Sequence, residues 1–140
     1  MTAAADALLP LQEELYGILI GDSTLTTLLG GNKIYDFIPD NEAFPYIHLG
    51  ETTADDRGAQ DHDGYTIFST FDVWSRPSDR GKAEALTIMS RIRQLIHNAD
   101  INVSGYTNVS CRYENSTVLV DPDCVTYHGI IRFRILLGGI

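Results

Sequence analysis

The sequence predicts an α+β fold: a mainly antiparallel sheet built from two long hairpins, with two helices packed on one face of the sheet. Two segments carry apolar residues at helical spacing, and four segments alternate apolar with polar residues. These elements follow one another in the order α, β, β, α, β, β. A chain of 140 residues supplies one hydrophobic core and is too short for two, so residues 1–140 are predicted to form a single domain.

The first helix follows a tail of small residues, 1–9, which we expect to be flexible. Pro10 fits the first helical position, where its missing N–H costs nothing. One stripe of the helix is apolar, formed by Leu11, Leu15, Ile18 and Leu19. Gly21 ends this helix, and Asp22 can cap a short helical turn that stops at the glycines of 30–32.

The first hairpin is predicted from strands at 46–53 and 64–75, joined by an acidic loop, 55–63, that we expect to be mobile. The second strand is partly apolar on both faces. One face carries Ile67, Phe71 and Val73, and the opposite face carries Phe68 and Trp74. Because the helices cover only one face, the aromatic residues on the other suggest that a further subunit covers it.

The strongest helical pattern lies in 81–98, whose apolar residues are Ala85, Ile88, Met89, Ile92, Leu95 and Ile96. A second hairpin follows, with strands at 108–120 and 125–137 around a turn at 121–124. If Val120 pairs with Val125, Cys111 faces Arg134 and lies about 33 Å from Cys124. This distance excludes a disulfide, so we expect Cys111 in the core and Cys124 as an exposed thiol.

Composition and motifs favour a chain without a catalytic centre or a cofactor. The net charge of -9 and the pI near 4.6 argue against a protein that grips nucleic acid through its phosphates. The four histidines have no zinc-site spacing, and no glycine-rich loop carries the Lys-Ser/Thr of a phosphate site. The start lacks the basic region of a signal peptide, and no apolar run is long enough to span a membrane, so we expect synthesis in a cytoplasm.

Two groups of charged residues are candidate interaction sites. The loop 55–63 supplies Asp55, Asp56, Arg57, Asp61 and Asp63, which we interpret as a solvated acidic arm rather than a calcium loop. A possible basic stripe consists of Arg112, Arg132 and Arg134, with the last two on the outer face of the final strand. In a chain of this net charge, the arginines are expected to pair with acidic groups of the same or a neighbouring subunit.

Several motifs occur in a specific order along nearly the whole chain. They are Leu28-Leu29-Gly30-Gly31 followed by Lys33-Ile34-Tyr35-Asp36 and Pro39, Phe44-Pro45-Tyr46-Ile47 before Leu49-Gly50-Glu51, Phe71-Asp72-Val73-Trp74-Ser75-Arg76, and Asp121-Pro122-Asp123 before His128-Gly129-Ile130-Ile131-Arg132-Phe133-Arg134. In this order the sequence resembles the tail-completion or tail-terminator proteins of long-tailed phages and gene transfer agents. That family often has Gly after Asp-Pro-Asp, where this chain has Cys124.

The resemblance implies a structural virion protein of the tail or neck, assembled in the cytoplasm of the bacterial host. Such proteins form a ring, usually a hexamer, on the last ring of tail-tube subunits, where they stop tube growth and present a surface to neck or head-completion proteins. DNA then passes through the lumen without specific binding, and an acidic wall avoids trapping it. The implied contacts are the acidic arm with a tube or neck partner or the lumen, and the arginines, together with Phe68 and Trp74, between subunits.

Three alternatives remain open at the level of sequence. A different neck or head-completion protein would share the particle but not the position. A small-ligand-binding regulatory domain would show an apolar pocket with convergent polar groups. A hydrolase would need one of the four histidines, His48, His62, His97 or His128, beside a nucleophile.

Overall fold

Five strands form one sheet in the order β1-β2-β3-β5-β4, and every neighbouring pair except β1 and β2 is antiparallel. The computed structural model describes residues 7–57, 64–79 and 81–139. Along the chain the elements are α1 (Leu8–Ile20), α2 (Ser23–Leu29), β1 (Ile34–Tyr35), β2 (Tyr46–Asp56), β3 (Gly64–Ser75), α3 (Ala83–Ile96), β4 (Tyr106–Val120) and β5 (Tyr127–Gly139). The predicted α+β class and antiparallel sheet are confirmed.

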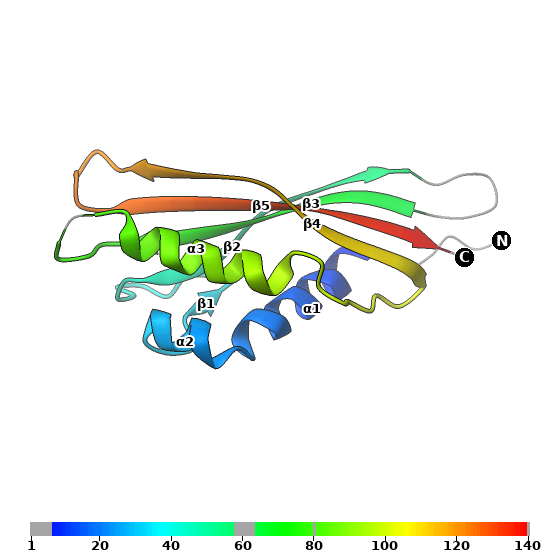
Figure 1. Ribbon diagram of the computed structural model, residues 1–140, viewed down its shortest axis with the longest axis horizontal. Helices are drawn as coiled ribbons and strands as arrows, with labels where there is room; N and C mark the ends of the chain where they lie inside the picture. The colour runs from blue at the N-terminus through cyan, green and yellow to red at the C-terminus, as the bar shows by residue number, and fades with distance from the viewer. Residues whose placement is uncertain (1–6, 58–63, 80, 140) are drawn as a thin grey trace.

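All three helices lie on one side of the sheet (Figure 1). The core forms between them and the inner sheet face, because the apolar stripe of each helix meets the alternate apolar residues of the strands. From α3 these are Ala85, Ile88, Met89, Ile92 and Ile96, and from the central strands they include Ile67, Phe71, Val73, Ile131, Phe133 and Ile135. None of the helices in the described ranges is long and apolar enough to cross a membrane.

The helices differ from the sequence prediction at the N-terminal end of the chain. The prediction of two helices was incomplete, because residues 23–29 form a separate α-helix, capped by Asp22 and ended by Gly30 in the left-handed conformation. Helix α1 begins at Leu8 rather than Pro10, since Leu8 already packs against the core. The predicted flexible tail therefore loses residues 8 and 9 to the helix, and residues 1–6 lie outside the described residues.

The predicted pairing of the second hairpin was wrong by one to two residues. Val120 pairs with Tyr127, so the connecting turn is longer than the predicted one, and a bulge between Tyr113 and Asn115 shifts the register again. Cys111 consequently faces Ile135 rather than Arg134. It points into the core as expected, and burial raises its pKa to about 11.

Both cysteines are free, Cys111 being buried and Cys124 exposed, as predicted.

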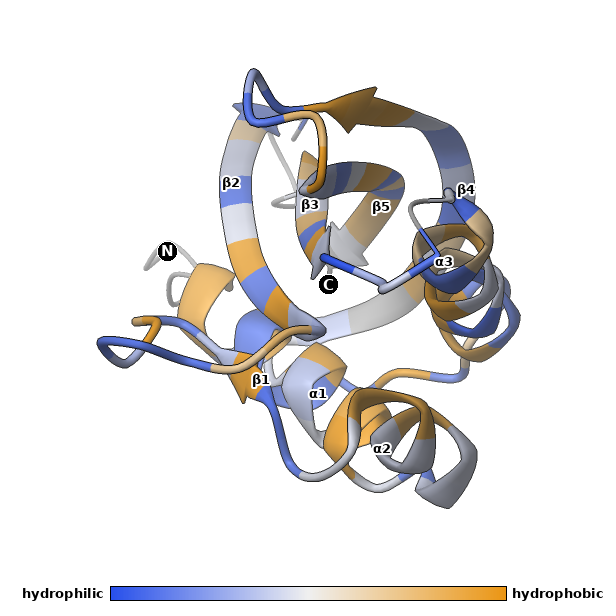
Figure 2. Ribbon diagram, turned by 90° about the vertical axis from the view of Figure 1, so that its left-hand side faces the viewer, coloured by the Kyte–Doolittle hydropathy of each residue, from blue (hydrophilic) through white to orange (hydrophobic). Residues whose placement is uncertain are grey.

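The sheet is strongly twisted, and the antiparallel pairing of β3 with β5 places the two hairpin ends at opposite ends of it. In Figure 1 the ends of β2 and β4 lie at opposite ends of the long axis, and Figures 1 and 2 together show both turned away from the helices. The last six residues of β2, 51–56, are all exposed, because no helix lies against them. The two hairpin ends therefore offer backbone and side chains that the core does not use.

Candidate assembly surface

Three arginines and one aromatic ring lie together on the outer sheet face, the face without helices. Strand register places Arg112 of β4 opposite Arg134 of β5, and Arg134 opposite Phe68 of β3. The guanidinium of Arg132 lies 5.0 Å from the centre of the Phe68 ring. We call Arg112, Arg132 and Arg134 the arginine cluster. The structure thus brings together four of the residues that the sequence analysis singled out.

The charges of the arginine cluster are poorly neutralised within the described part of the chain. Arg112 hydrogen-bonds only to the Asn98 side-chain oxygen, at 3.3 Å, and has no carboxylate partner there. The single ion pair of Arg134, with Glu114, spans 4.0 Å between two well-exposed side chains. Nε of Arg132 is buried and has no hydrogen-bond partner among the described residues. Like charges opposite each other on neighbouring strands repel, so Arg112 and Arg134 destabilise the free chain unless an anion joins them.

The acidic arm begins as a strand rather than as a loop. Asp55 and Asp56 belong to β2, where they pair with Thr66 and Tyr65 of β3, so the predicted loop 55–63 was wrong at its start. The backbone N–H of Arg57 donates to the Gly64 carbonyl at 3.0 Å and extends this pairing by one residue. Asp61 and Asp63 lie outside the described residues. We call Glu51, Asp55 and Asp56 the acidic edge.

Trp74 does not join the arginine cluster. It lies on the same face as Phe68 but six residues further along β3, about 20 Å away. Its ring stacks on His128, with centroids 3.9 Å apart and an interplanar angle of 11°. The indole N–H is buried without a partner among the described residues. Trp74 therefore stabilises a different part of the outer face.

A histidine-aspartate network next to Trp74 was missed by the sequence analysis. The Asp72 carboxylate meets Nδ1 of His48 at 3.3 Å and Nε2 of His128 at 2.9 Å. These residues come from three neighbouring strands, and His48 is the register partner of Asp72. A correct prediction of how β2, β3 and β5 pair would have placed these three side chains next to one another. Within the described ranges, no three His, Cys, Asp or Glu side chains are arranged to hold a metal ion.

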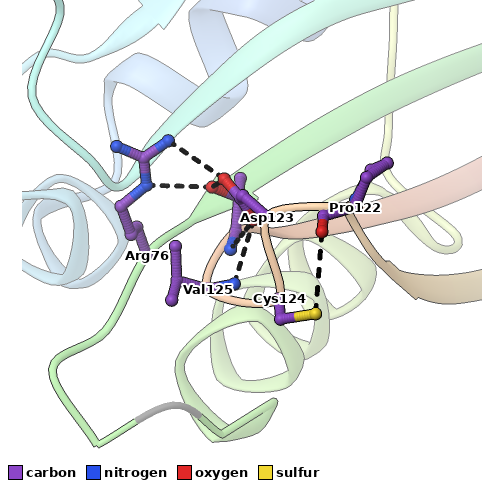
Figure 3. A network of polar contacts seen from close by, with 6 residues as sticks. Arg76, Pro122, Asp123, Cys124 and Val125 are labelled. Atoms are coloured by element: carbon purple, nitrogen blue, oxygen red, sulfur yellow. Dashed lines mark hydrogen bonds and ion pairs between the residues drawn. The ribbon is translucent and has the colours of Figure 1, made fainter.

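The turn between β4 and β5 is held by the carboxylate of Asp123 (Figure 3). It accepts hydrogen bonds from the backbone N–H groups of Val125 and Thr126, both at 2.9 Å, and from the Thr126 hydroxyl at 2.6 Å. Arg76 lies 3.4 Å from the same carboxylate. Cys124 adopts the left-handed conformation, with φ of 62°, so the turn keeps that geometry without glycine. Asp123 therefore shapes the turn that the sequence predicted at 121–124.

Replacing Asp123 with alanine is expected to lower the thermal midpoint at neutral pH, because the turn loses its acceptor. The hydrogen bonds from Thr126 and Val125 lower the pKa of Asp123 to about 2. A carboxylate with a lowered folded pKa adds stability above about pH 4, and this stability is lost as the pH falls towards 2. Melting curves followed by circular dichroism between pH 7 and pH 2 should therefore show a shallower acid dependence for the variant. Asp121→Ala is the matched control, and equal midpoints for both variants would contradict this role.

The hollows among the described residues are poor candidates for a small-ligand site. The enclosed one, between α1 and the β2–β3 hairpin, holds only about 20 Å³, close to the volume needed for one water molecule. Larger ones of about 440 to 590 Å³ are open depressions along the helices. The enclosed hollow is too small for a ligand and the larger ones are open, so these hollows do not support the regulatory small-ligand alternative.

Comparisons with known proteins point to one family. The model of the family described as "Tail completion protein gp17" matches residues 13–138. Tail completion protein gp17 of Bacillus phage SPP1 is 26% identical over 108 residues, which cover 77% of this chain and 78% of the relative. A chain of the solved structure "Virion of native gene transfer agent (GTA) particle" superposes with a TM-score of 0.87 at 20% identity, covering 97% of this chain and 100% of the other. This last likeness shows a shared fold.

Proposed function

The chain belongs to the tail completion protein gp17 family, and on this premise we propose that it caps the tail tube of a phage or gene transfer agent particle as a hexameric ring. The ring ends tail elongation and supplies the surface on which the tail joins the head. The observation that carries the proposal is the family match, which spans residues 13–138.

The proposed partners are further copies of the chain, the last ring of tail-tube protein, and a neck or head-completion protein. The role is structural and not enzymatic, and the protein resides in the virion after assembly in the host cytoplasm. DNA passes the lumen without specific binding, which a net charge of -9 favours, because an acidic wall repels the polyanion.

Deletion of the gene tests this function. Particles made without the protein are expected to have tails of abnormal length or tails that do not join heads, and a plasmid copy should restore both. Electron micrographs of purified particles give tail length and the fraction of joined tails. Tails of normal length that fail to join would favour the neck or head-completion alternative. Normal infectious particles would contradict the proposal.

A further inference from the structure

Among the described residues, the three charges of the arginine cluster meet a single carboxylate, Glu114, which lies 4.0 Å from Arg134. Arg112, Arg132 and Arg134 are three of the ten basic residues in a chain with nineteen acidic ones. Two of the three are cross-strand neighbours, and the third keeps a buried N–H without a partner among the described residues. An Arg side chain binds carboxylates through paired N–H groups, so the missing partner is expected to be an acidic surface.

The acidic edge lies on β2, three strands across the same sheet from Arg112 on β4. One row of register partners crosses the sheet from Thr53 of β2 through Phe68 and Arg134 to Arg112 of β4. Arg112 ends this row at the β4 edge, and Asp55 lies at the β2 edge two residues further along, in the row that runs through Thr66 and Leu136 to Ser110. Strand β1 pairs only with Ile47 and His48 of β2. Beyond these two residues, β3 is the only strand that pairs with β2 in the described part of the chain. The two edges thus carry opposite charge at levels that differ by two residues along the strands.

This placement favours a contact between copies over a contact within one copy. Three strand spacings, about 14 Å, separate β2 from β4, and no ion pair joins the acidic edge to the arginine cluster in the described residues. Strands β2 and β4 run antiparallel, so two copies placed side by side present edges of opposite charge and opposite direction. A contact between two different surfaces is heterologous, the type that closes into a ring.

Side chains rather than backbone make this contact on the β4 side. The Cys111 carbonyl already accepts the Asn98 N–H at 2.8 Å, and the Tyr113 N–H donates to Nδ1 of His97 at 2.9 Å. These bonds cover the β4 backbone next to Arg112, while its guanidinium remains exposed. The neighbouring copy therefore meets the arginines on the outer face.

We propose that the acidic edge of one copy, Glu51, Asp55 and Asp56, docks on the arginine cluster of a second copy, Arg112, Arg132 and Arg134. This inference rests on the proposed ring and names the surfaces that form it. A protein carboxylate is favoured over a nucleic acid as the partner of the arginine cluster, because the net charge of -9 repels phosphates at long range. The acidic edge, in contrast, is present on every copy of the chain.

Charge reversal on each side tests the contact. Asp55→Arg and Arg112→Asp are expected to weaken self-association at least tenfold each, because both bring like charges together. The double variant Asp55→Arg/Arg112→Asp should regain association, and so should an equimolar mixture of the two single variants, as alternating copies. Glu14→Arg in α1 and Lys82→Asp just before α3 make the same charge changes at exposed positions and should associate as the unaltered chain does.

Association is measured by native mass spectrometry of the purified protein and by binding to purified tail tubes, at low and at physiological salt. Unchanged association of both reversed variants would overturn the inference, as would a loss that neither the double variant nor the mixture restores. Loss of tail-tube binding by Arg112→Asp with intact self-association would assign the cluster to the tube protein. Particles that carry Arg112→Asp and lose only their packaged DNA, with both kinds of association intact, would assign it to DNA. Both results overturn the proposed contact, yet abnormal tails after gene deletion would leave the proposed function standing.

Discussion

Replacing Phe133 with alanine is expected to lower the free energy of unfolding by about 3–5 kcal/mol. The side chain is 0% exposed and lies on the inner face of β5, the strand between β3 and β4. Its ring makes edge contacts with Phe71 at 5.9 Å and with Tyr113 at 6.2 Å between centroids. Removal of the ring leaves a cavity where strands from both hairpins meet, so loss of packing adds to the loss of apolar burial.

Phe37→Ala is the matched control for this prediction. The Phe37 side chain is 84% exposed, so the same substitution should change the free energy of unfolding by less than about 0.5 kcal/mol. Urea denaturation followed by circular dichroism measures both variants. Similar small losses for Phe133→Ala and Phe37→Ala would show that the core is not organised around β5 as described.

Asp22→Ala is expected to cost about 2 kcal/mol, because one carboxylate both caps α2 and anchors α3. Oδ2 of Asp22 accepts the Leu25 backbone N–H at 2.8 Å. Arg91 of α3 donates to both carboxylate oxygens, from Nε at 2.8 Å and from the terminal nitrogen at 2.7 Å. The residues are 69 positions apart in the sequence, so the pair fixes the two helices against each other.

The acid dependence separates the cap from the ion pair. The hydrogen bonds from Arg91 lower the pKa of Asp22, so its contribution is complete at neutral pH and is lost as the pH falls below about 4, through the lowered pKa of the folded state. Asp22→Asn retains a capping oxygen but not the charge, and is expected to fall between the parent chain and Asp22→Ala at pH 7. Urea titrations at pH 7 and pH 3 measure this. An equal loss for Asp22→Ala at both pH values would contradict the ionic contribution.

The fold could be predicted where the hydrophobic pattern was long enough to show its period. The apolar stripe of α3 and the alternation along β5 each extend over at least eleven residues, and both elements were confirmed. Helix α2 could not be predicted in the same way, because seven residues cover barely two turns and four of them are Ser or Thr. The β4–β5 register was missed because the connecting turn is two residues longer than predicted, and the bulge at Glu114 then shifts the pairing by one residue without a signal in the alternation of neighbouring residues.

The candidate surface could be predicted only in part. Arg132 and Arg134 alternate with buried residues, so their place on the outer face followed from the period of two. Their meeting with Phe68 depends on pairing between β3 and β5, which are separated in the sequence by α3 and β4. The partners of Asp72 and Asp22 likewise come from distant segments. Such contacts follow from tertiary pairing, which local pattern does not encode.

Cryo-electron microscopy of the intact particle tests the central claim most directly. We expect one ring of this chain at the head-proximal end of the tail tube, between the last tube ring and the neck, with the acidic edge of each copy against the arginine cluster of the next. A map that places the chain elsewhere in the particle, or that shows tube and neck in direct contact without it, would contradict the account.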